Sequence, residues 1–340
     1  MSLESHAPLR VGLLGVGTVG SAFAELVAAR PELRLVKALV RDPAKPRRIA
    51  RAHDLLTTDP DEVIASSDLV VELMGGTGVA VEVMREALDR GLSVVTANKA
   101  ALAERWHEFA GALKTGRLYI EASVMAGTPV IGPIAGVLRG SAPHEIHAVL
   151  NGTCSFVLGR LAQGACYDAA LAEAQRRGYA EADPTLDVSG IDAAHKLAIL
   201  ARLTVDPDLS WEQVRHGTSG IERLRSGSVQ QAMGEGERIE LVGSIVPDRS
   251  GWSTSVRPVR LPAGHPLVTG DEARATLLYR GAGGEVIMSG PGAGGVETAS
   301  AVLGEVLAAL AGRPGPAPLT AAVPVPVEAA RYDHGELQPA

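Results

Sequence analysis

The sequence predicts an α/β protein: a Rossmann-type nucleotide-binding domain, built on a parallel sheet, with an inserted α+β domain for substrate binding and dimerisation. Near the N-terminus a short apolar strand runs directly into a glycine-rich turn and a helix, and strands and helices then alternate. The 340 residues also exceed the size at which one core usually stops growing, so two domains are expected.

We expect four segments along the chain. They are a dinucleotide-binding domain over residues 1–135, a catalytic and dimerisation domain over 136–286, a return segment over 287–312 that packs on the nucleotide domain, and a Pro- and Ala-rich C-terminal tail over 313–340. The tail has no periodicity that supports a core.

Composition excludes several classes of partner. The net charge of -7 and the lack of a clustered basic face argue against nucleic acid. Apolar runs end before the roughly 20 residues that a bilayer span requires, and the N-terminus lacks the pattern of a signal peptide. The only two cysteines, Cys154 and Cys166, are too few for a disulfide framework. We therefore expect a cytoplasmic protein without membrane or nucleic-acid partners.

The first strand, Leu9 to Leu14, leads into a GxGxxG turn, and apolar residues then repeat at helical spacing. Such a turn lets the pyrophosphate of a dinucleotide approach a helix N-terminus. The motif alone is weak, but its place between a strand and a helix favours a nicotinamide or flavin site. The candidate cofactor residues of this turn are Gly15, Gly17, Thr18, Val19 and Gly20.

The second strand, Leu33 to Val40, ends at two neighbours that point to different cofactors. Asp42 would accept hydrogen bonds from a free ribose 2′-hydroxyl, as in NAD. Arg41, helped by Arg47 or Arg48, would pair with the 2′-phosphate of NADP. We favour NADP and Arg41, while NAD, or a strand end that is merely solvated, stays possible.

Further candidates follow the next two strands, Leu69 to Leu73 and Ser93 to Thr96. A ligand of a parallel sheet lies at the carboxyl ends of its strands, and Gly75, Asn98 and Lys99 follow such ends. Lys99 could meet the phosphates or nicotinamide of the cofactor, or a substrate carboxylate.

After a strand at Arg117 to Ile120, the chain enters a Gly- and Ala-rich bend over residues 121–129. Backbone carbonyls turned inward in such a bend, together with one carboxylate, suit a hard cation. On the sequence alone an ordinary turn is the favoured interpretation.

The most unusual stretch is Gly178 to Leu203. Its first half is an acidic, Pro-containing loop with Glu181, Asp183 and Asp187, and its second half is apolar at helical spacing after Ser189, a candidate helix cap. Asp192 and Lys196 are four residues apart and share one helical face. Packing alone gives no reason to gather these carboxylates and a lysine in one stretch. The alternative to a functional role is a surface ion pair beside an acidic loop, worth about 0.3 to 0.5 kcal/mol. The apolar stripe of this helix would be Ile191, Ala198, Ile199 and Leu203.

The second domain begins with a strand at His144 to Leu150, a turn at Asn151-Gly152-Thr153 and one helix from Phe156 to Leu171. Strand-like stretches follow at Ile239 to Val246 and Trp252 to Val259. A second glycine-rich turn, Ile287 to Ala299, precedes a helix at Ser300 to Leu310, and it would bring Gly294 near the cofactor.

Six motifs together resemble the homoserine dehydrogenase family over nearly the whole chain from Val11 to about Leu310. They are GVGTVG (15–20), TANKA (96–100), EASVMAGTPVI (121–131), LNGT (150–153), GYAEADPTLDVSGIDAAHKLAILA (178–201) and GPGAGGVETASAVLG (290–304). The acidic stretch is the most specific of them. The resemblance implies a dimeric enzyme of threonine and methionine biosynthesis that interconverts L-aspartate 4-semialdehyde and L-homoserine with a nicotinamide cofactor.

The resemblance also implies roles for particular residues. Lys196 matches the proton donor, Asp192 the carboxylate that supports it, and Lys99 a second lysine at the reaction centre. Gly294 matches a cofactor contact. The residues that match the homoserine site are Glu181, Asp187, Gly152, Thr153 and Tyr179, and those whose backbone carbonyls match a sodium site are Glu121, Val124, Ala126 and Thr128.

Some positions depart from the family pattern. Cys154-Ser155-Phe156 stands where Thr-Asn-Tyr is usual, and Met125 and Thr128 alter the cation loop. These departures leave open a related dehydrogenase acting on another small amino-acid semialdehyde, or a dinucleotide-binding sensor without turnover. Because no regulatory domain follows the last helix, we expect no control by threonine through that route.

Overall fold

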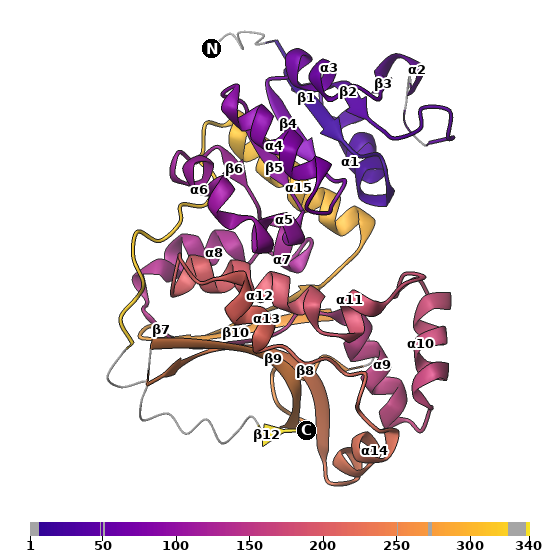
Figure 1. The fold of residues 1–340 in the computed structure, drawn as a ribbon, viewed down its shortest axis with the longest axis vertical. Helices are drawn as coiled ribbons and strands as arrows, with labels where there is room; N and C mark the ends of the chain where they lie inside the picture. Colours follow the sequence, from indigo (N-terminus) through magenta and orange to yellow (C-terminus); the bar gives the residue numbers. More distant parts are fainter. Residues whose placement is uncertain (1–6, 48, 50–51, 250, 271–273, 326–337) are drawn as a thin grey trace. The chain divides into compact units, whose positions relative to one another are not determined.

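The computed structural model describes residues 7–47, 49, 52–249, 251–270, 274–325 and 338–340 (Figure 1). Contacts divide the chain into two units, the first made of residues 1–129 and 294–318 and the second of residues 130–293 and 319–340. None of the helices in the described part of the chain is long and apolar enough to cross a membrane.

The first unit contains a six-stranded sheet of order β3-β2-β1-β4-β5-β6, in which every pairing is parallel. The strand order reverses between β1 and β4, which is where dinucleotides bind in sheets of this topology. The predicted Rossmann-type sheet is therefore confirmed. Its strands are β1 (Leu9–Leu14), β2 (Leu33–Leu39), β3 (Leu56–Thr57), β4 (Leu69–Glu72), β5 (Ser93–Thr96) and β6 (Leu118–Tyr119).

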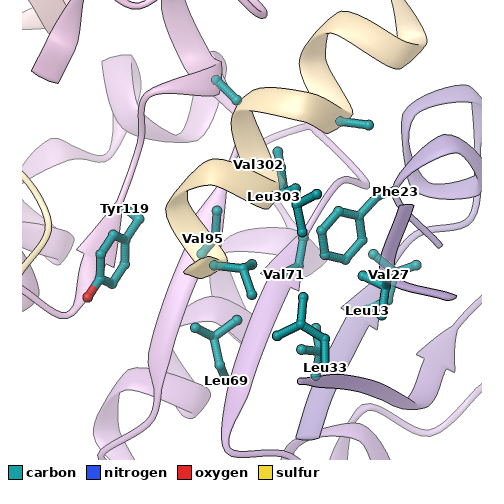
Figure 2. Packing of buried hydrophobic residues seen from close by; sticks show 14 of the residues in the cluster. Leu13, Phe23, Val27, Leu33, Leu69, Val71, Val95, Tyr119, Val302 and Leu303 are labelled. Atoms are coloured by element: carbon teal, nitrogen blue, oxygen red, sulfur yellow. The ribbon is translucent and has the colours of Figure 1, made fainter. Parts of the chain in front are cut away.

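The core of this unit lies where α15 and α1 cover the sheet. Figure 2 shows Val302 and Leu303 of α15 facing Phe23 of α1 and Val71 of β4, all of them buried. Such an apolar layer fixes the first helix after the glycine-rich turn against the strands that carry it. The helices of the unit are α1 (Thr18–Ala28), α2 (Ala52–Leu55), α3 (Pro60–Ser66), α4 (Val79–Asp89), α5 (Lys99–Glu104), α6 (Trp106–Lys114), α7 (Ala122–Met125) and α15 (Gly295–Leu310).

The second unit contains a separate antiparallel sheet of order β11-β10-β7-β8-β9-β12. Its central strand, β7, is buried along its whole length. The α+β character expected for this part of the chain is confirmed. The strands are β7 (Pro143–Val149), β8 (Glu237–Asp248), β9 (Gly251–Pro262), β10 (Arg274–Gly281), β11 (Gly284–Pro291) and β12 (Gln338–Pro339).

Helix α12 (Ile191–Thr204) is buried on all sides, since every residue from Asp192 to Thr204 is buried. The expectation of a single buried stripe was too narrow, because neighbouring elements also cover the polar face of the helix. The other helices of the unit are α8 (Ile131–Ala135), the 3-10 helix η1 (Val137–Gly140), α9 (Gly152–Ala162), α10 (Tyr167–Arg176), α11 (Thr185–Val188), α13 (Trp211–His216) and α14 (Ser226–Gly234).

Two local predictions for this unit were wrong because glycines change the backbone direction. The expected single helix over 156–171 is two helices, α9 and α10, since Gly164 has a φ of 99° and ends the first. Ser189 does not cap α12. Gly190 is the N-cap, with a φ of 81°, and Ser189 instead closes the short helix α11.

Three further expectations differ from the structure. Residues Ile287 to Pro291 pair with β10 as strand β11, so the glycine-rich turn is shorter than expected. The tail also forms backbone contacts with the second unit: Val323 N–H donates to the Val205 carbonyl at 2.6 Å, and the Trp252 indole N–H donates to the Val323 carbonyl at 2.7 Å. The first division between the units falls after Pro129, whereas we expected it after Ala135.

Candidate active site

The site in the second unit is built on the junction between β7 and α9. Asn151 is the N-cap of α9, and its Oδ1 accepts the Cys154 N–H at 2.8 Å. An asparagine is well suited to this position, because its side-chain oxygen satisfies an amide that has no partner within the helix. This bond fixes the orientation of the side chain beneath the acidic stretch.

The amide nitrogen of Asn151 joins two of the carboxylates. It donates to Asp187 Oδ1 at 2.8 Å and to Asp192 Oδ2 at 2.9 Å. Asn151 is only 3% exposed. Sequence reasoning placed it in a turn and missed this role; an Asn directly before a helix indicates a cap, but its partners lie 36 and 41 residues away.

Lys196 and Asp192 form a buried ion pair. Lys196 Nζ lies 3.0 Å from Asp192 Oδ2, and each side chain is 8% exposed. The ammonium also donates to the Leu150 carbonyl at 2.6 Å. The interpretation of this pair as a surface contact is wrong. Breaking a buried pair strands a charge at a cost of about 3 to 5 kcal/mol, so neither partner can be replaced without consequence.

The residues around this pair form a second layer of contacts. Thr153 Oγ1 donates to the Tyr179 carbonyl at 2.6 Å, and the Tyr179 ring lies 5.0 Å from that of Phe156. The Cys154 thiol donates to the Asp187 carbonyl at 3.2 Å, and burial raises the pKa of this thiol. The thiol therefore acts here as a neutral donor that anchors the backbone of the acidic loop.

The structure does not bring all the predicted carboxylates together. Glu181 is exposed on the loop, where its backbone carbonyl accepts from the Gln175 side chain at 3.3 Å. Asp183 is occupied by a local turn, since it accepts from the N–H and hydroxyl of Thr185. Only Asp187 and Asp192, of the four acids in this stretch, share a partner.

The glycines of the first turn have different roles. A β-carbon on Gly20 would lie 2.1 Å from the Gly15 carbonyl oxygen, so this glycine is required by the packing of the turn itself. Gly17 caps α1, and a β-carbon there would meet nothing within 4 Å. Packing within the protein therefore does not require a glycine at position 17. Such open space next to the backbone is expected where a phosphate group approaches it. Thr18 and Val19 follow as the first residues of α1.

A buried carboxyl group, missed by the sequence analysis, organises the ends of β4 and β5. Glu72 accepts from the N–H groups of Met74 at 2.7 Å and Gly75 at 2.9 Å, and from the Thr96 hydroxyl at 2.6 Å. Asn98 extends this network, since its side chain donates to the Gly76 carbonyl at 2.8 Å. Asn98 also caps α5, the helix that begins with the half-buried Lys99.

The end of β2 is less organised. Arg41 and Asp42 are both exposed, and Asp42 Oδ1 accepts the Ala44 N–H at 2.9 Å. Arg47 folds back on the Asp42 carbonyl at 2.7 Å. Arg48 lies outside the described residues. Arg41 and Asp42, the two residues predicted to bind the ribose, are thus both exposed.

The second glycine-rich turn lies in the first unit with the first one. Gly294 caps α15 with a φ of 135°, and a β-carbon on the next residue, Gly295, would lie 2.8 Å from the Thr18 methyl group. The N-termini of α1 and α15 therefore meet, which puts two helix N-termini at the same end of the sheet.

The predicted cation loop contains α7 and an unusual backbone turn. Ala126 has a φ of 48°, and the Thr128 N–H donates to the Met125 carbonyl at 2.8 Å. Glu305 Oε1 accepts the Glu121 N–H at 2.7 Å, while its Oε2 is buried with no hydrogen-bond partner in the described chain. No three His, Cys, Asp or Glu side chains gather as metal ligands among the described residues. A cation here would thus be held by backbone carbonyls, and the unpartnered oxygen fits a site that can receive positive charge.

A Rossmann sheet whose first strand ends in a glycine-rich turn, and a buried ammonium in the second unit, fit the class of oxidoreductases that use a nicotinamide dinucleotide. Family models agree: the NAD-binding domain of homoserine dehydrogenase matches residues 15–122, and the homoserine dehydrogenase model matches residues 129–307. The chain belongs to the homoserine dehydrogenase family. It is an NAD(P)-dependent enzyme acting on a CH–OH group.

Individual relatives support this assignment. Homoserine dehydrogenase of Corynebacterium glutamicum is 37% identical over 319 residues, covering 88% of this chain and 71% of the relative. That of Bacillus subtilis is 34% identical, covering 89% and 73%. A homoserine dehydrogenase structure from Thiobacillus denitrificans has a TM-score of 0.80 at 34% identity, covering 88% and 72%. A hyperthermophilic archaeal homoserine dehydrogenase in complex with NADPH has a TM-score of 0.75 at 27% identity, covering 91% and 99%.

Proposed function

We propose that this protein reversibly reduces L-aspartate 4-semialdehyde to L-homoserine, with Lys196 as the proton donor. The observation that carries the proposal is the buried contact of 3.0 Å between Lys196 Nζ and Asp192 Oδ2. A carbonyl that receives hydride needs a proton on its oxygen, and a buried ammonium supplies both that proton and electrostatic stabilisation. Family membership supports the choice of substrate.

In the reductive direction, Lys196 donates its proton to the aldehyde oxygen as the carbonyl carbon receives hydride. When bound, the nicotinamide cofactor supplies that hydride. Asp192 keeps the ammonium charged, and the Leu150 carbonyl at 2.6 Å fixes its direction. Lys99, at the start of α5, is the second lysine that the family resemblance assigns to the reaction. In the oxidative direction the same steps run backwards, so neutral Lys196 accepts the hydroxyl proton.

The acidic stretch holds the amino group of the substrate in this proposal. A substrate ammonium needs carboxylate acceptors, and Asp187 is already fixed by Asn151 at 2.8 Å. Glu181, exposed on the loop, would be a further acceptor for the substrate ammonium. Gly152, Thr153 and Tyr179 border the same place, since Thr153 is bonded to the Tyr179 carbonyl at 2.6 Å.

The preferred cofactor is NADP in our proposal, with Arg41 as the ligand of the 2′-phosphate. Initial rates with homoserine and each cofactor, repeated for Arg41→Ala, test this. We expect the KM for NADP to rise about tenfold in the variant, because a charge-assisted contact is lost, while the KM for NAD stays the same. Undiminished NADP use by Arg41→Ala would remove Arg41 as the ribose reader.

Gly17→Ala tests cofactor binding without disturbing the fold. Since a β-carbon there meets nothing within 4 Å, we expect the melting temperature to stay the same. The KM for either cofactor should rise at least about tenfold, because the added methyl group occupies the approach of the pyrophosphate. The matched variant Gly20→Ala should instead unfold at lower temperature.

Three finer features belong to the same proposal. Sodium would be held by the backbone carbonyls of Glu121, Val124, Ala126 and Thr128. The protein would act as a homodimer in the cytoplasm, where its cysteines, which are free in the structure, stay reduced. Light scattering would test the dimer, and rates with sodium replaced by a larger cation would test the ion.

The decisive test of the function is oxidation of L-homoserine by purified protein at alkaline pH, monitored as the reduction of NADP or NAD. If the protein oxidised homoserine with neither NADP nor NAD, the proposal would be refuted. A second candidate is a dehydrogenase for another small amino-acid semialdehyde, since Cys154 stands against the Asp187 carbonyl in the substrate region. Amino alcohols of four and five carbons, compared by kcat/KM, would separate the two.

A further inference from the structure

We propose that Asn151 is a positioning residue that holds Asp187 and Asp192 together, so that the acid for the substrate and the acid for the proton donor act as one unit. This inference rests on the proposed function, because it assigns a role within that site. It concerns a residue to which neither the motif pattern nor the family resemblance assigned chemistry.

One nitrogen atom makes both contacts. Asn151 Nδ2 carries two hydrogens, and it lies 2.8 Å from Asp187 Oδ1 and 2.9 Å from Asp192 Oδ2. Each hydrogen thus serves one carboxylate. The two acids are therefore held on either side of a single atom, close enough to repel each other, and Lys196 pairs with Asp192 at 3.0 Å.

The side chain cannot turn round without losing these contacts. Its Oδ1 accepts the Cys154 N–H at 2.8 Å. A flipped amide would place its oxygen against two carboxylates and its N–H groups against the N–H of Cys154, so three contacts would become repulsive. The cap of α9 thus locks the amide that faces the acids.

A neutral amide is suited to this position. It donates to both carboxylates, which favours their charged forms, and adds no charge of its own. An ammonium in its place would compete with Lys196 for Asp192. A continuous path of polar contacts then joins Leu150, Lys196, Asp192, Asn151 and Asp187. A shift of the acid that holds the substrate is therefore transmitted to the acid that orients the proton donor.

Two substitutions separate this role from helix capping. Asn151→Ser keeps a good cap and adds no charge, but it is too short to reach the carboxylates. Asn151→Asp keeps the cap and the size, but it replaces both donors by a third carboxylate. Both variants should retain α9, and both lose the two donated bonds.

We expect kcat/KM for homoserine to fall about tenfold to a hundredfold in Asn151→Ser, as for other residues that orient functional groups, and further in Asn151→Asp. The acid limb of the kcat/KM profile against pH should move up by about one unit in Asn151→Ser, and by more in Asn151→Asp. The NADP dissociation constant, measured by fluorescence, should stay within about twofold, because the cofactor turn belongs to another unit of the chain.

A matched control is Asp59→Ala, which removes the side-chain cap of α3 in the first unit. It should lower the melting temperature and leave the pH profile unchanged. The inference is overturned if Asn151→Ser retains full kcat/KM, or if its loss is uniform across pH and merely follows a lower melting temperature. Failure of the unmodified protein to oxidise homoserine would count against the proposed function itself, and the two failures are distinct.

Discussion

Each unit of this protein buries a carboxyl group at the end of a strand or helix, but the partners differ. Glu72 of the first unit is fully buried and accepts only from neutral donors in the contacts described, namely two backbone N–H groups and the Thr96 hydroxyl. Burial raises its pKa. Asp192 of the second unit is 6% exposed and faces the Lys196 ammonium at 3.0 Å.

The difference shows how the same chemical group serves two purposes. Neutral donors around Glu72 fix the backbone after β4 and β5, so its role is to hold the loops in shape. Asp192 and the Lys196 ammonium stabilise each other's charge in a buried place that water does not reach. The ammonium thereby keeps a proton there. We therefore expect the first carboxyl group to contribute to structure and the second to contribute to proton transfer.

Among changes to the carboxyl groups, the largest effect is expected when Asp192 loses its charge. Asp192→Asn should lower kcat/KM for homoserine by about 10²- to 10³-fold, because Lys196 loses the anion that keeps it protonated and oriented. Glu72→Gln, the matched change in the first unit, should stay within about threefold of the unmodified enzyme. Steady-state kinetics of both variants measure this difference. Equal losses of kcat/KM would contradict the distinction between the two carboxyl groups.

Another buried acid, Glu240, accepts hydrogen bonds from neutral donors and tests whether the contrast lies in the units or in the partners. Glu240, in the second unit, accepts from the Ser155 hydroxyl at 3.0 Å and the Thr269 N–H at 3.1 Å, and burial raises its pKa to about 7. A raised pKa means that the folded chain binds this proton more tightly. Its stabilising effect is therefore present below about pH 4.5 and is lost as pH rises to about 7.

The loss should amount to about 3 kcal/mol between those pH values, and Glu240→Gln should remove most of it. Urea unfolding from pH 4 to pH 8 measures the free energy of unfolding of both proteins. If the variant kept the full pH dependence of the free energy of unfolding, Glu240 would not be the group responsible. The contrast between Glu72 and Asp192 would then be assigned to the units in which they lie rather than to their partners.

The smallest effect is expected for the stability of Glu72→Gln. Because burial raises the pKa of Glu72, its carboxyl group also destabilises the fold as pH rises above its ordinary value of 4.5. The neutral amide keeps an acceptor for the N–H groups, so we expect the variant to be as stable as the parent at pH 8, within about 1 kcal/mol. A loss well beyond that would mean that an anion is needed here.

The features that the sequence predicts are the ones encoded by local patterns. The strand at Leu9 to Leu14, its glycine turn and the alternation of strands and helices that builds a parallel sheet follow from periodicity and turn residues over short distances. The pairing of Asp192 with Lys196 follows from helical spacing alone. The family resemblance rests on the same short motifs.

What the sequence could not predict depends on contacts between distant segments. The Asn151 amide meets Asp192 across 41 residues, and Thr96 meets Glu72 across 24 residues. No periodicity reports such pairs. The burial of Lys196 was equally hidden, since a four-residue spacing is the same for an exposed pair and a buried one. The turn at Gly164 lies within a stretch whose apolar pattern predicts one continuous helix. The turn at Gly190 follows Ser189, which the sequence favours as the helix cap.

The most direct test of the central claim is the single-turnover rate of homoserine oxidation by Lys196→Ala, with cofactor in excess. We predict a rate lower by about 10²- to 10⁴-fold, the range for loss of a general acid–base group, with an unchanged dissociation constant for NADP. Lys114→Ala, a change at an exposed lysine of α6, should leave the rate unaltered. A Lys196→Ala rate within about threefold of the unmodified enzyme would show that another group moves the proton.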